Sequence, residues 1–239
     1  MTKDLVISQI SKSFGRTDAL KDVSFVAHAG EVVGLLGENG AGKSTLLRIL
    51  GGTLEADTGF VTFRNEEMSN CKRRNLSATL FGNNVGLYGD LTARENIEFF
   101  ARLRGLDVQS ADVRLKDLAI EFGMVSYLDK KVLTLSKGMK QKVAIVRSII
   151  HSPSIILFDE PASGLDFASA KTACDFLQRE AREGKVAILS SHSVGDVIAT
   201  CDRIAVLHKG SLIGCYSVKE LTSDCSLEEA YQRIFNLVK

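Results

Sequence analysis

The amino-acid sequence predicts an α/β fold in which helices cover a mainly parallel sheet. In the last third of the chain, apolar strands alternate with amphipathic helices, an order typical of parallel sheets. Near residue 40, a glycine-rich loop stands between a buried strand and the start of a helix. The 239 residues can bury a sizeable core, which suits one large α/β domain or two small ones.

The N-terminal third reads as strands. Segments 5–10, 23–27 and 60–63 are short, rich in β-branched or aromatic residues, and bounded by Gly or Asp turns. A further apolar strand, 31–36, precedes the glycine-rich loop, and the helix that follows the loop begins at Ser44.

In the middle third of the chain, the apolar residues recur at helical spacing. Thr92 to Glu95 reads as a capping box that starts one helix, and Gly105 stops it. A second helix carries apolar residues at helical spacing from Leu115 and ends at Gly123. We therefore expect an inserted helical subdomain. Its predicted bounds are 89–150, within a core made of 1–88 and 151–239.

In the last third of the chain, strands and helices alternate. We expect a buried strand over 154–159, a helix over Ala168–Arg182 and a second buried strand over 186–190. A hairpin over 203–214 should turn at Lys209-Gly210.

Composition excludes some classes of function. The formal net charge of +1 argues against an electrostatic binder of nucleic acid. Lys72, Arg73 and Arg74 form a short basic run, which we expect to be a solvated turn. The five cysteines are scattered and include no C-x-x-C, which favours a reducing cytoplasm. The sequence shows no signal peptide and no apolar stretch of spanning length.

The glycine-rich loop carries the strongest chemical signal. G-E-N-G-A-G-K-S, residues 37–44, fits the phosphate-loop pattern G-x-x-x-x-G-K-[ST]. Its backbone N–H groups and the following helix N-terminus suit a β-phosphate, and Lys43 suits the β- and γ-phosphates. Ser44 would hold Mg²⁺. A purely structural Gly-rich turn is the weaker interpretation. The residues expected to bind nucleotide here are Gly37, Asn39, Gly40, Ala41, Gly42, Lys43, Ser44 and Thr45.

Two carboxylates follow the strand over 154–159. Asp159 would orient Mg²⁺ through its water shell, and Glu160 would act as general base for an attacking water. Acidic residues that cap a helix look the same in isolation. Paired with the phosphate loop, the two carboxylates indicate a nucleotide hydrolase.

The segment L-S-K-G-M-K-Q-K-V, residues 135–143, narrows the class. In isolation, Ser136 reads as a helix N-cap and Gly138 as a first-turn glycine. The segment also resembles L-S-G-G-Q, the signature motif of ATP-binding cassette (ABC) ATPases, with Lys137 and Met139 replacing one of its glycines and its glutamine.

Three more segments resemble motifs of the same family, in the family's order. A-S-G-L-D, residues 162–166, is similar to its D-loop. His192 stands where the family has a switch histidine, and Phe14 where an aromatic ring stacks on adenine. By itself, each would read as a core or strand-end residue. The resemblance implies a RecA-like P-loop core with a mixed sheet, an N-terminal antiparallel β subdomain and an inserted helical signature subdomain, all in a single cassette over 1–239.

The resemblance also implies a mechanism. Two cassettes, here expected to form a homodimer, would pair head to tail around ATP and Mg²⁺. Ser136 and Gly138 would then contact the γ-phosphate held by the partner's phosphate loop. Hydrolysis would remove those contacts and open the dimer.

One position departs from the family pattern. The Q-loop glutamine should fall within residues 80–88, where the alignment puts Asn83. Its amide is one methylene shorter, so it would reach the metal or the catalytic water directly or through another water. We therefore expect Asn83 to act in catalysis and metal binding, with slower or more partner-dependent hydrolysis.

Several kinds of protein use these motifs. A GTPase would need N-K-x-D, which is absent. A soluble ABC ATPase acting on ribosomes or DNA typically has two cassettes or a coiled-coil insertion, and a non-hydrolysing switch would not need Glu160 and His192. The sequence resembles ATPase subunits of exporters with a separate membrane subunit, with sodium-extruding exporters closest in pattern. Drug, lipid, polysaccharide and peptide exporters share these features.

The resemblance also places the chain in the cell. We expect a cytoplasmic subunit, peripheral at the inner face of the cell membrane through a transmembrane permease subunit, with no nucleic-acid partner. Residues 81–88 and the helix after Thr92 should form the groove that receives the permease.

Overall fold

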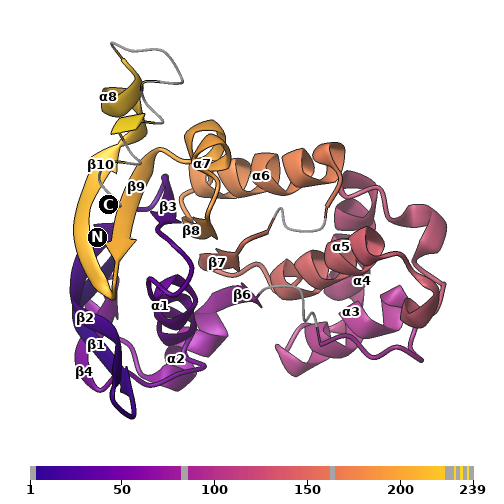
Figure 1. Cartoon of the computed structure of the whole chain (residues 1–239). Coiled ribbons are helices and arrows are strands. Elements are labelled where there is room, and N and C mark those ends of the chain that lie inside the picture. Colours follow the sequence, from indigo (N-terminus) through magenta and orange to yellow (C-terminus); the bar gives the residue numbers. More distant parts are fainter. Residues whose placement is uncertain are drawn as a thin grey trace. The chain divides into compact units, whose positions relative to one another are not determined.

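A computed structural model describes residues 4–81, 86–161 and 165–223, together with 229, 232, 233 and 236. The chain divides into two compact units (Figure 1). The first unit comprises Met1–Thr79, Ser154–Glu160 and Leu177–Lys239, and the second comprises Leu80–Pro153 and Pro161–Phe176. The second unit is thus wider than the predicted helical subdomain. That all of this makes one cassette stays a prediction.

The first unit begins with an antiparallel sheet in the order β2-β1-β4-β5. Its strands are β1 (Leu5–Phe14), β2 (Thr17–Ala27), β4 (Thr58–Phe63) and β5 (Glu66–Glu67). Strands β1 and β2 extend beyond the predicted segments because their outer ends are polar and exposed, so the apolar pattern underestimates their length.

The second sheet of this unit has the order β10-β9-β3-β8-β7-β6. Its strands are β3 (Val32–Leu36), β6 (Ser77–Phe81), β7 (Ile155–Asp159), β8 (Val186–Ser191), β9 (Arg203–His208) and β10 (Ser211–Ser217). Strands β7, β8, β3 and β9 run parallel, whereas β10 pairs antiparallel with β9. The sheet is therefore mixed, as predicted. Every residue of β3, β7 and β8 is buried, which places the core at the centre of the sheet.

Short helices accompany this sheet. They are α1 (Lys43–Leu50), α2 (Asn70–Leu76), α7 (Val194–Thr200) and α8 (Val218–Thr222). The expectation of a solvated turn at residues 72–74 is wrong, because these residues lie in α2 and the Arg73 side chain is buried. Ser69 caps the helix by accepting from the Lys72 N–H.

The second unit is helical. It holds α3 (Ala93–Leu103), α4 (Val108–Glu121), the single turns η1 (Val125–Tyr127) and η2 (Val132–Thr134), and α5 (Lys137–Ile149). Helix α6 (Phe167–Arg182) begins in this unit and ends in the first.

The capping box at the start of α3 is confirmed. The Thr92 hydroxyl accepts from the Glu95 N–H, and the Glu95 carboxylate accepts from the Thr92 N–H at 2.7 Å. The buried Asn96 amide donates to the Tyr88 carbonyl at 3.0 Å and accepts from the Tyr88 N–H at 2.9 Å. These bonds fix Tyr88 against the first turn of α3. Within the described residues, no helix is both long and apolar enough to cross a bilayer.

Candidate nucleotide site

The site begins where β3 ends. The glycine-rich loop leads from the carboxyl end of β3 into α1, whose N-cap, Gly42, has φ of 104° and offers no side-chain cap. The first N–H groups of α1 therefore have no partner within the helix. Together with the positive end of the helix dipole, they suit an anion.

Two glycines let the loop pack tightly. A Cβ on Gly37 would lie 2.3 Å from the Leu207 carbonyl oxygen, and one on Gly42 would lie 2.5 Å from that of Ala19. Gly42 also has a positive φ, which side chains disfavour. The loop thus rests on the backbones of β9 and β2, and any larger residue would displace it.

Lys43 lies inside the loop. Its side chain is buried, and its Nζ donates to the Gly37 carbonyl at 2.6 Å and to the Glu38 carbonyl at 3.0 Å. Burial lowers the pKa of the Lys43 amine below its ordinary value, and the carboxylates of Glu160 and Asp159 oppose that shift. The two carbonyl acceptors hold the amine in place, and a phosphate oxygen could replace them.

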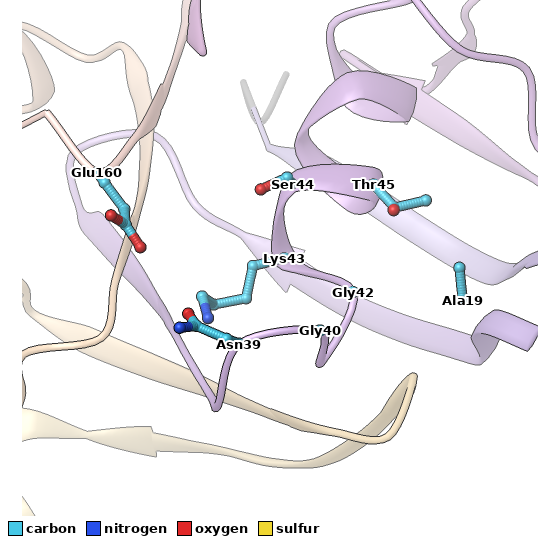
Figure 2. A pocket seen from close by; sticks show the side chains of 8 residues that line it. All are labelled: Ala19, Asn39, Gly40, Gly42, Lys43, Ser44, Thr45 and Glu160. Carbon is cyan, nitrogen blue, oxygen red and sulfur yellow. The ribbon is translucent and has the colours of Figure 1, made fainter. Parts of the chain in front are cut away.

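A cavity of about 170 Å³ opens over the loop. Figure 2 shows Glu160 across this cavity from Gly40 and Gly42, with its carboxylate turned toward Lys43 and Ser44. The groups around this cavity include backbone N–H groups, one cation, two hydroxyls and one carboxylate. It is lined by Ala19, Asn39, Gly40, Gly42, Lys43, Ser44, Thr45 and Glu160.

Asp159 and Glu160 are held by the neighbouring strand. The parallel register pairs Asp159, the last residue of β7, with Ser190 of β8. The Ser190 hydroxyl donates to Asp159 Oδ1, and the Glu160 N–H donates to the Ser190 carbonyl at 3.1 Å. Glu160 itself has φ of 50°, in the left-handed region. Asp159, before this turn of the backbone, is buried, whereas Glu160 is half-buried and lines the cavity.

His192 lies beside Glu160. It follows β8, and its exposed ring places Nδ1 3.1 Å from Glu160 Oε1. The structure thus brings together two residues that are 32 positions apart in the sequence. The contact holds the Glu160 side chain at one of its two oxygens and leaves the other for a ligand or water.

Phe14 ends β1, where it pairs with Thr17 of β2, and its ring is 51% exposed. Asn83 lies outside the described residues, as do residues 162–164 of the D-loop. The final D-loop residue, Asp166, accepts from the Ser169 N–H at 3.0 Å in the first turn of α6.

Ser136 and Gly138 belong to the second unit. Ser136 is the N-cap of α5, and its hydroxyl accepts from the Met139 N–H at 3.2 Å. Helix α5 begins at Lys137, so Gly138 lies in its first turn, as expected from its position after the N-cap. This helix start offers backbone N–H groups like those of α1.

Sequence reasoning missed two residues of the site. Ala19 lines the cavity from β2, and Ser190 holds both carboxylate residues. The polar pair Ser190-Ser191 at the end of an apolar run was a usable signal, because the ends of adjacent parallel strands meet at one edge. Ala19 gave no signal, since only the packing of β2 on the loop reveals it.

The arrangement can bind and cleave a polyphosphate. The loop, α1 and Lys43 provide donors for phosphate oxygens, and Glu160 provides a base within the same cavity. Ser44 and the buried Asp159 are oxygen donors of the kind that Mg²⁺ prefers, so the residues present fit this metal.

Comparison with known proteins indicates the same family as the sequence motifs. Residues 20–163 match the family described as "ABC transporter". The chain is 44% identical over 199 residues to the "ABC transporter ATP-binding protein NatA" of Bacillus subtilis (strain 168), covering 82% of this chain and 80% of that protein.

Solved structures share the fold. A "Structure of ATP binding subunit of ABC transporter" superimposes with a TM-score of 0.86 at 29% identity, covering 97% of this chain and 99% of that one. The structure of cbiO1 from Clostridium perfringens, described as part of the ABC transporter complex cbiONQ, gives a TM-score of 0.81 at 25% identity, with 96% and 93% covered.

Proposed function

The chain belongs to the ABC transporter family as an ATP-binding subunit, and we propose that it dimerises on ATP to power an exporter. Its activity is ATP hydrolysis coupled to transport. One observation above all supports the proposal: the Glu160 carboxylate and the Lys43 amine line the same cavity over the phosphate loop. The two units together would form one cassette.

ATP would bind with its phosphates in the loop. Its β-phosphate would accept from the N–H groups of Gly40 to Thr45, and Lys43 would exchange its bonds to Gly37 and Glu38 for phosphate oxygens. Phe14 would stack on the base. Ser44 and Asp159 would hold Mg²⁺, which supplies charge neutralisation at the phosphates when bound.

Glu160 would serve as the general base. Its backbone is fixed by Ser190, and one of its carboxylate oxygens is engaged by His192. The second oxygen can accept a proton from a water that attacks the γ-phosphate. His192 would orient Glu160 and stabilise charge that develops on the phosphate. Asn83, outside the described residues, would contact the metal or this water.

A second copy of the chain would complete the site. The ATP-binding cassette MJ0796 has a solved structure described as dimeric, and cbiO1 is described as part of the ABC transporter complex cbiONQ. Here, Ser136 and Gly138 at the start of α5 would donate to the γ-phosphate of ATP held by the partner copy. A homodimer is consistent with one chain that carries both the loop and the signature motif.

The permease would dock on the second unit. Tyr88 and Phe99 are 51% and 41% exposed, and their rings meet edge to face at 5.6 Å. Exposed aromatic side chains of this kind are typical of protein interfaces. Docking here would hold the chain at the inner face of the membrane.

The decisive experiment is a pull-down. Tagged Glu160→Gln protein with Mg-ATP is incubated with detergent-solubilised membranes of the native cell, and bound proteins are identified by mass spectrometry. We expect a multi-spanning membrane protein to be recovered, and Phe99→Ala added to Glu160→Gln should reduce its yield. Recovery of ribosomal or DNA-associated proteins instead would contradict the transporter proposal.

Sodium ions are the substrate we propose to test first, because the sequence pattern resembles that of sodium-extruding exporters. Vesicles containing this chain and the recovered permease are placed in sodium buffer and given external Mg-ATP, so that an exporter with outward-facing cassettes carries sodium into the lumen. We expect ATP-driven sodium movement that the Glu160→Gln variant lacks. ATP turnover without sodium movement would reject sodium while leaving the transporter proposal intact.

A further inference from the structure

Lys12 and Asp57 form an ion pair next to Phe14. The Lys12 Nζ lies 2.5 Å from Asp57 Oδ1, and the lysine side chain is 15% exposed. The two residues come from β1 and from the turn before β4, so the pair joins neighbouring strands. The Lys12 side chain is half-buried, so the ion pair restrains it more than it would a fully exposed lysine.

Asp57 also binds the backbone immediately before Phe14. Its Oδ2 accepts from the Ser13 N–H at 2.7 Å, and its own N–H donates to the Ser11 carbonyl at 2.9 Å. Both carboxylate oxygens are therefore engaged, one by the Lys12 ammonium and one by the main chain. This single side chain fixes the path of β1 where the strand ends.

The Lys12 ammonium lies over the Phe14 ring, 5.6 Å from its centroid. This distance is within the range of a cation–π contact. The ring remains 51% exposed, so the contact with Lys12 leaves aromatic surface open. Lys12 thus restrains the ring from one side, and the restraint depends on Asp57.

Phe14 stands on the hairpin that packs against the phosphate loop. It pairs with Thr17, and two residues further along β2, about 7 Å by strand geometry, Ala19 lines the cavity. At Ala19 the β2 backbone touches the loop so closely that Gly42 has no room for a Cβ. The hairpin of β1 and β2 therefore carries the ring and also contacts the loop.

We propose that the Lys12–Asp57 ion pair positions Phe14 for stacking on the nucleotide base, and so sets the base-dependent part of the affinity for ATP. The proposal rests on the assignment of Phe14 as the adenine-stacking residue. A ring that is already oriented loses less side-chain freedom when the base binds. Neither Lys12 nor Asp57 touches the phosphates in this arrangement, so their effect should vanish for a ligand without a base.

The test compares ATP with inorganic tripolyphosphate, which lacks the base and the ribose. Asp57→Asn and Lys12→Met remove the pair at similar side-chain size. We expect each to raise KM for ATP about two- to fivefold, the range of an exposed cation–π contact, with little change in kcat. Inhibition by tripolyphosphate should be unaltered. Lys72→Met is the matched control, since its ion pair with Glu66 joins α2 to β5, the edge strand of the same sheet that does not pair with β1.

The Phe14→Ala variant distinguishes the stacking role of Phe14 from the positioning role of the Lys12–Asp57 pair. If it leaves KM for ATP unchanged, the stacking role of Phe14 fails, and the proposal fails with it. If Phe14→Ala raises KM but Asp57→Asn and Lys12→Met do not, only the positioning role is overturned. Equal weakening of ATP and tripolyphosphate by Asp57→Asn would mean a merely structural role. We expect the Phe14→Ala, Asp57→Asn double variant to be no worse than Phe14→Ala, and additive effects would contradict action through the ring.

Discussion

Ser190 links the two carboxylate residues of the site. Its hydroxyl donates to Asp159, and its carbonyl and hydroxyl oxygens both lie 3.1 Å from the Glu160 nitrogen. A side chain that binds no ligand itself can thus decide where the base and the metal-binding carboxylate stand. Such supporting hydrogen bonds commonly matter as much as the residues they orient.

We predict that Ser190→Ala lowers kcat for ATP about tenfold, the lower end of effects seen for supporting residues. The loop and Lys43 remain intact, so nucleotide affinity should change little. Steady-state phosphate release and equilibrium binding of a fluorescent ATP analogue measure the two quantities. A variant with normal kcat would show that Ser190 is dispensable for orienting Asp159 and Glu160.

Asp57 should make stability depend on pH. Its hydrogen bond from Lys12 and the one from the Ser13 N–H lower the pKa of the Asp57 carboxyl. A depressed pKa in the folded state stabilises the protein above the carboxyl's ordinary range, about 4. That stabilisation is lost as the pH falls through the lower, folded-state value.

We therefore predict that Asp57→Asn unfolds at lower urea concentration than the unmodified chain at pH 7, and that the gap narrows toward about pH 3. Circular dichroism at a series of pH values gives the midpoints. Asp117→Asn, at an exposed position of α4, serves as a comparison variant. A gap that is the same at every pH would mean that the Asp57 charge does not contribute.

Elements with strong local signals were predicted well. The buried strands β3, β7 and β8, the capping box of α3 and the turn at Lys209-Gly210 all appear as expected. Helix α2 was missed because it is short and polar, and its start depends on one cap, Ser69. The burial of Arg73 could not be foreseen, since it depends on the packing of α2 and not on its composition.

The capping box of α3 gives an element-scale prediction. Thr92→Ala removes the hydroxyl that accepts from the Glu95 N–H, and it loosens the chain that leads from Tyr88 into the helix. We expect a loss of about 1 kcal/mol in the free energy of unfolding, measured by urea titration. Thr92→Ser should restore most of this loss. Equal stability of all three proteins would show that the box adds nothing to the fold.

At the scale of the whole molecule, the order of motifs indicated the family, and the comparisons confirm it. What the sequence could not provide were the contacts between distant segments. The Asp159–Ser190 pairing depends on strand register, and the Lys12–Asp57 pair joins residues 45 positions apart. The Ser190-Ser191 pair marks a strand end, but neither it nor the motif spacing says which strands become neighbours, and both contacts depend on that.

The central claim is that Glu160 hydrolyses ATP held between two copies of this chain. Light scattering and phosphate release on purified Glu160→Gln protein with Mg-ATP test it most directly, with Lys43→Ala as the variant that should not bind nucleotide. The account predicts an ATP-dependent dimer without turnover for Glu160→Gln, and no dimer for Lys43→Ala. A Glu160→Gln protein that still releases phosphate, or that binds ATP and stays monomeric, would contradict it.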